Sequence, residues 1–132
     1  MRHFQLIIRY AWVSPATAVG LLSSIIAMCA GATPRIVDGT IEVAGGHLHC
    51  LVSRLPPCAR FAAITFGHVI LAVDDAARLR CRAHERVHVA QYERWGALFL
   101  VLYPASSAIQ WLRGRDPYYD NPFEREAFDA RH

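Results

Sequence analysis

The chain has 132 residues, of which 54% are hydrophobic and 19% are charged, and its net charge at pH 7 is +3. Average soluble domains are about 45–50% apolar and about 25% charged, so this composition excludes a disordered chain and indicates contact with a membrane. The length fits one small domain, and because the arginines form no basic stripe we expect no nucleic-acid partner.

The N-terminal segment carries no charged residue from Tyr10 to Pro34. As a helix, Tyr10–Gly31 would be about 33 Å long, enough to cross a hydrocarbon core of about 30 Å. Arg2 and Arg9 precede this stretch, which favours a cytoplasmic N-terminus. We therefore predict that residues 1–34 form a single-pass transmembrane anchor, with the lipid bilayer as a partner.

A cleaved signal peptide is the alternative interpretation of the same segment. Ala30-Gly31-Ala32 fits an A-x-A cleavage site, and the mature chain would then be exported. The apolar stretch is long for the hydrophobic region of a signal peptide, which favours the anchor.

The next part of the chain predicts a small antiparallel sheet. Arg35–Val43 reads as a strand or a tight hairpin, because Asp38-Gly39 is a typical two-residue hairpin turn. His47–Ser53 is expected to be a second strand, and Phe61–Val73 is apolar and rich in β-branched residues, as in one long strand.

The rest of the chain predicts helices, so the fold class is α+β and residues 35–132 form one domain. Ala76–Arg94 lacks glycine and proline and is expected to form a long helix. Ala97–Leu112 would be about 24 Å long as a helix, which is too short to cross a bilayer. Since Pro104 interrupts it, we expect an apolar helical hairpin, buried or at the membrane interface, followed by a short helix over Phe123–Ala130 that Asn121 caps.

The string His84-Glu85-Arg86-Val87-His88 carries the chemistry. Residues four apart lie on one face of a helix, so both imidazoles can reach one ion. Zinc binds neutral imidazole nitrogens, lowers the pKa of water and polarises a carbonyl group. Glu85 would lie beside the ion rather than on it, where its carboxylate can accept a proton from water. These residue types at this spacing fit zinc-dependent hydrolysis of a peptide bond.

A catalytic zinc needs a third protein ligand, and the last helix offers Glu124, with Glu126 as a possible backup ligand. This motif pair, with Ala127 three residues after Glu124, resembles the gluzincin branch of the zincin metallopeptidases. The resemblance implies that His84, His88 and Glu124 are zinc ligands in a mini-zincin-like domain. It also implies that Glu85 is the general base.

The chain departs from the gluzincin pattern immediately after Ala127. That pattern often places Asp or Asn at this position to orient a ligand histidine, whereas this chain has Phe128. The motif pair is also similar to that of small bacterial membrane proteins, which implies a bacterial cell membrane and names no substrate.

The alternative is a noncatalytic membrane protein, either a degenerate zincin or a chain with a structural or interaction role. In that case the two histidines would be solvated residues on an amphipathic helix. Other residues are possible neighbours of a cleft, or core residues, namely His68, Gln91, Tyr92 and Tyr118. Aromatic residues around the apolar segment are interpreted as interfacial anchors, namely Trp95, Tyr103 and Trp111. The oligomeric state stays open.

Overall fold

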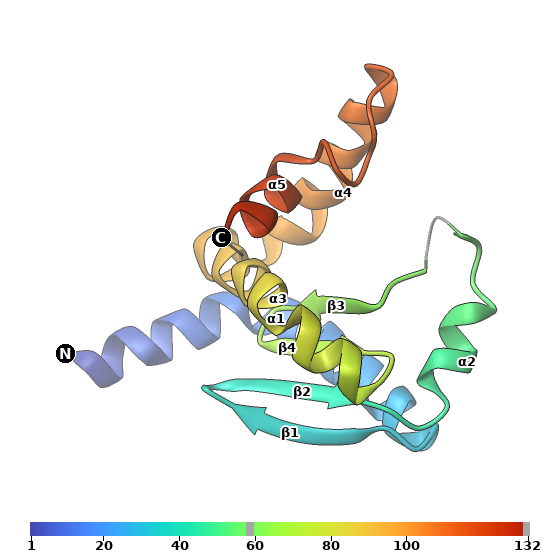
Figure 1. The fold of residues 1–132 in the computed structure, drawn as a ribbon. Coiled ribbons are helices and arrows are strands. Elements are labelled where there is room, and N and C mark those ends of the chain that lie inside the picture. Colours follow the sequence, from blue (N-terminus) through green and yellow to red (C-terminus); the bar gives the residue numbers. More distant parts are fainter. Residues whose placement is uncertain (58–59, 131–132) are drawn as a thin grey trace.

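The computed structural model describes residues 1–57 and 60–130, which form an α+β fold (Figure 1). Helix α1 (Arg2–Cys29) confirms the predicted N-terminal apolar helix. Its first turns extend away from the rest of the chain, whereas the helix from Arg9 onward packs on the sheet and on the long helix α3 (Asp75–Trp95). The contact is close, since a Cβ on Gly20 would lie 2.7 Å from the Cβ of Val69.

Two helical stretches among the described residues are long and apolar enough to cross a membrane, namely α1 and the run Asp75–Leu112. In the second stretch, the apolar part follows Arg94, because no charged residue lies between Arg94 and Arg113. On α1, Leu22 and Ile26 are 65% and 67% exposed, while the opposite face is buried. The chain therefore has helices suited to a membrane or to a signal sequence.

The strands of the described residues form one four-stranded mixed sheet with the order β1-β2-β4-β3. They span Thr33–Val37 (β1), Thr40–Ala44 (β2), Ala63–Phe66 (β3) and Val69–Ala72 (β4). The first two strands confirm the predicted hairpin, with positive φ angles at both turn residues, Asp38 and Gly39.

The prediction of an antiparallel sheet was wrong for its central pair, because β2 and β4 run parallel. The expected single strand over Phe61–Val73 is instead the hairpin β3–β4. Gly67 permits the turn, since it has a φ of +61° and a Cβ there would lie 2.6 Å from the backbone nitrogen of Thr17. This turn reverses the chain, so that β4 aligns with β2.

The predicted strand over His47–Ser53 was also wrong, because this segment is the helix α2 (Leu48–Ser53). Leu48 and Val52 are buried, and their spacing of four residues fits one face of either a strand or a helix. Cys50 would share that face in a strand, but it is exposed. The burial pattern therefore fits only the helix.

Helix α3 confirms the predicted long helix, and it packs on the sheet. It begins where the Asp74 side chain accepts a hydrogen bond of 2.7 Å from the backbone N–H of Ala77. Glu42 on β2 is fully buried and receives hydrogen bonds from Arg78 at 3.0 Å and from Arg82 at 2.8 Å. This buried ion cluster fixes the N-terminal half of α3 on the sheet.

The apolar segment is one helix rather than the predicted hairpin. A short 3-10 turn (Gly96–Leu98) leads from α3 into α4 (Phe99–Leu112), and Pro104 lies inside α4 without ending it. The chain reverses only after α4, and α5 (Pro122–Asp129) runs back toward α3 (Figure 1). The predicted short C-terminal helix is confirmed, and Asn121 caps it with a hydrogen bond of 3.0 Å from the N–H of Phe123.

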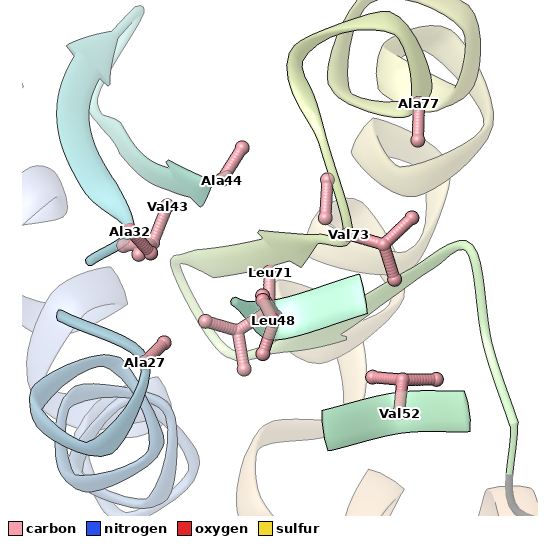
Figure 2. Close-up of a cluster of buried hydrophobic side chains, with 10 residues drawn as sticks. Ala27, Ala32, Val43, Ala44, Leu48, Val52, Leu71, Val73 and Ala77 are labelled. Atoms are coloured by element: carbon pink, nitrogen blue, oxygen red, sulfur yellow. The ribbon is translucent and has the colours of Figure 1, made fainter. Parts of the chain in front are cut away.

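Among the described residues, two clusters of buried apolar side chains hold these elements together. The first joins the end of α1, the sheet, α2 and the start of α3, and Figure 2 shows Leu48 and Val52 of α2 facing Leu71 and Val73. The second joins α1 to the end of α3 and the start of α4 through Val13, Ala16, Tyr92 and Phe99. Phe123 of α5 packs against the second cluster, so this core positions α5 beside α3.

Candidate metal centre

The site forms where α5 packs on the middle of α3. His84 and His88 lie one helical turn apart on α3, and Glu124 lies in the first turn of α5. All three side chains are buried, with exposed fractions of 3%, 6% and 3% respectively. Since buried charged and polar groups need partners, their convergence defines a specific polar site inside an apolar shell.

The distances within this group fit a metal ion. Glu124 Oε2 lies 2.8 Å from His84 Nε2, and Glu124 Oε1 lies 3.2 Å from His88 Nε2. One ligand atom from each of the three residues lies within 4.8 Å of the other two. Tetrahedral zinc with ligands at about 2.0–2.2 Å would place neighbouring ligand atoms about 3.4 Å apart, so modest side-chain shifts would suffice. The buried group of His84, His88 and Glu124 could therefore hold a metal ion.

Glu85 lies next to this group and is itself buried, with an exposed fraction of 6%. Its Oε2 accepts a hydrogen bond of 2.7 Å from the Thr65 hydroxyl group on β3. Thr65 thereby holds the Glu85 carboxylate toward the sheet, whereas the Glu124 carboxylate contacts both imidazoles. The Glu124 carboxylate thus lies between the two imidazoles, and the Glu85 carboxylate lies beside them.

Burial and hydrogen bonding shift the pKa values of Glu85 and Glu124 in opposite directions. Burial alone would raise the pKa of Glu124, but its hydrogen bonds with His84 and His88 outweigh burial and lower that pKa to about 2. Burial opposes the charged imidazole of His88, yet the adjacent Glu124 carboxylate raises the pKa of His88. Burial raises the pKa of Glu85, and the neighbouring His88 and Thr65 offset only part of this effect.

The remaining predicted residues divide into those near the site and those away from it. Glu126, the possible backup ligand, is exposed and pairs with Arg94 at 3.4 Å, so it lies outside the group. Tyr118 packs on Phe128, whose ring centroid lies 4.7 Å from that of His84, and burial together with the nearby Glu124 carboxylate raises the pKa of the Tyr118 hydroxyl group, so this residue borders the site.

Of three further residues predicted near a cleft, Tyr92 and His68 are buried away from the candidate metal group, whereas Gln91 contacts one of its histidines. Tyr92 is buried in the cluster that joins α1 to α4. His68 lies on the β3–β4 turn in a separate group, 3.0 Å from Glu93 and stacked on the Tyr10 ring. Gln91 is fully buried, and its amide contacts His88 rather than an open surface.

Two residues of the site were missed by the sequence analysis. Tyr103, interpreted as a membrane anchor, points inward from α4 and donates a hydrogen bond of 2.5 Å to Glu124 Oε1. Thr65 contacts Glu85 from an edge strand. The distance of Tyr103 and Thr65 from residues 84–88 along the sequence does not predict these contacts. Only the packing of α4 and β3 on α3 brings the two residues to the site.

Comparison of the chain with models of protein families, with curated proteins and with solved structures found no match. The assignment of a function therefore rests on the geometry and chemistry of the site.

Proposed function

We propose that the protein is a membrane-associated zinc metallopeptidase. The observation that carries this proposal is the buried convergence of His84, His88 and Glu124 with Glu85 beside them. Two imidazoles and one carboxylate are a donor set that suits zinc and leaves a fourth position for water or substrate. Calcium and magnesium favour oxygen-only donor sets, which makes zinc the better fit.

In this proposal three residues bind the metal ion and a fourth, Glu85, transfers a proton. His84, His88 and Glu124 bind and orient the ion, which supplies water activation and polarisation of the scissile carbonyl when bound. Glu85 takes the proton from the attacking water on its carboxylate and later passes it to the leaving amine. Its raised pKa suits this task, because a general base works best when its pKa lies near the working pH.

Zinc content tests the first half of the proposal. The purified wild-type protein should contain about one zinc ion per chain, and His88→Ala should contain little. His49→Ala is a matched control, because His49 is an exposed histidine on α2. A wild-type protein without stoichiometric metal, or equal zinc in the His88 and His49 variants, would contradict the proposed site.

Catalysis is tested separately with Glu85→Gln and a library of unstructured peptides. This variant should keep its zinc and lose peptide hydrolysis, because Glu85 moves a proton without binding the ion. Zinc-loaded wild-type protein that cleaves no peptide in the library would instead support the noncatalytic alternative.

Membrane association follows in this proposal from the apolar outer face of α1, with α1 as the anchor. Because α5 brings the chain back from the end of α4 to α3, we infer that α4 lies at the membrane surface and does not cross it. Reporter fusions at positions 75 and 132 should then report the same side of the membrane. Opposite sides would separate the histidines from Glu124 and refute a joint site.

A further inference from the structure

Gln91 connects two of the three candidate ligands. It lies three residues after His88 on α3, and its side chain is fully buried. Its Oε1 lies 2.8 Å from His88 Nδ1, and its Nε2 donates a hydrogen bond of 3.0 Å to the backbone carbonyl of Phe123. Phe123 directly precedes Glu124, so one amide group contacts both ligand-bearing segments.

These two contacts fix which way the amide of Gln91 faces. A backbone carbonyl only accepts hydrogen bonds, so the NH₂ group of Gln91 must face Phe123 and the amide oxygen must face His88. An amide oxygen also only accepts, so Nδ1 of His88 carries a hydrogen. The nitrogen of His88 that faces Glu124, Nε2, is then the one left to bind an ion.

The second imidazole has no equivalent support. His84 Nδ1 is buried and has no hydrogen-bond partner among the described residues. The Phe128 ring packs on this imidazole, at the position where the gluzincin pattern often carries an orienting Asp or Asn. Polar orientation of the ligand histidines thus depends on the contact between Gln91 and His88.

We propose that Gln91 is the positioning residue of the metal centre. It selects the tautomer of His88 that presents Nε2, and it holds the first turn of α5 so that Glu124 meets both imidazoles. This inference rests on the proposed zinc site. Residues that orient metal ligands in this way typically contribute about 10- to 100-fold to metal affinity.

The test compares Gln91→Met with Gln110→Met by zinc titration against a chromophoric chelator. Gln110 is a matched control, because it is a buried glutamine on α4 whose Oε1 has no partner among the described residues. We expect zinc affinity to fall about 10- to 100-fold in Gln91→Met and to stay within about threefold of wild type in Gln110→Met. Equal affinities of the two folded variants would overturn the proposal.

For the conservative variant Gln91→Glu we expect a smaller loss of zinc affinity than for Gln91→Met. It keeps an acceptor for His88 Nδ1–H and loses the donor to Phe123, so it should bind zinc more tightly than Gln91→Met. If Gln91→Glu binds zinc no more tightly than Gln91→Met, this result contradicts the role assigned to the contact between Gln91 and His88.

A measurement on the wild-type protein tests the proposed tautomer of His88 even if Gln91→Met does not fold. Nitrogen-15 spectra of the zinc-loaded wild-type protein should show His88 protonated at Nδ1 and metal-bound at Nε2. Coordination through Nδ1 would overturn the proposal while leaving the zinc site itself intact. A wild-type protein that binds no zinc would instead remove the proposed function, and this inference with it.

Discussion

The carboxylate of Glu124 is the most informative group to perturb, because it faces both imidazoles. We expect Glu124→Gln to destabilise the metal-free protein in a pH-dependent way. The pKa of this buried group falls from 4.5 to about 2 in the folded chain, a difference that corresponds to roughly 3 kcal/mol of stability at most. Glu126→Gln is the matched control, since Glu126 lies on the same helix and is exposed.

The pH window follows from the direction of each pKa shift. The lowered pKa of Glu124 contributes stability above about pH 4.5, and this contribution is lost as the pH falls toward 2. The raised pKa of His88 contributes stability below about pH 6.5, and it is lost as the pH rises through the folded-state pKa. The difference in unfolding free energy between wild type and Glu124→Gln should therefore be largest between about pH 4.5 and 6.5.

Urea unfolding in the presence of a chelator, repeated across this pH range, measures the difference. Glu126→Gln should stay within about 0.5 kcal/mol of wild type at each pH, because exposed ion pairs contribute little. A difference for Glu124→Gln that does not change with pH, or that Glu126→Gln reproduces, would refute the assigned ion pairing.

Three further predictions concern the base, the sheet and the N-terminal helix. Thr65→Val removes the hydrogen bond that opposes the burial of Glu85, so the pKa of Glu85 should rise and the acidic limb of the kcat/KM profile should move to higher pH. An unchanged profile would contradict this link. Glu42→Ala removes the buried carboxylate that Arg78 and Arg82 share and leaves the buried Arg78 with its contact to the exposed Asp75, so it should cost about 3–5 kcal/mol in urea unfolding. A loss below about 1 kcal/mol would show that the cluster is not buried in solution. Deletion of residues 1–32 removes the α1 side chains from both apolar clusters, so circular dichroism should show loss of the cooperative thermal transition. A deletion variant that melts like the full chain would show that α1 is a dispensable leader.

The string of residues 84–88 and the ends of the helices were predictable because they depend on local rules. Residues four apart share a helical face, which placed His84 and His88 together in any fold that keeps this segment helical. Asn121 could be recognised as a cap because its side chain satisfies a free N–H group at the start of its own helix. The hairpin turn at Asp38 was equally local, since its geometry restricts which residues fit.

The wrong secondary-structure predictions concern segments whose local sequence pattern fits two different structures. Leu48 and Val52 match either a strand face or a helix face, and burial against the sheet decided for the helix. The apolar run over positions 61–73 was long enough for one strand, but Gly67 packs against the backbone of α1 and the chain reverses there. Pro104 suggested a reversal in the apolar segment, yet α4 continues through it.

The site shows the same division between local and tertiary information. Sequence patterns alone determined that two imidazoles and an adjacent carboxylate share one stretch of helix, and they limited the third ligand to Glu124 or Glu126. Only the tertiary structure places Glu124 and not Glu126 beside the imidazoles, because the packing of α5 on α3 buries Glu124 and leaves Glu126 in solvent. It also brought Tyr103 to Glu124. Periodicity specifies which side chains share a face within one element, whereas the meeting of faces from distant elements depends on how the whole chain buries its apolar surface.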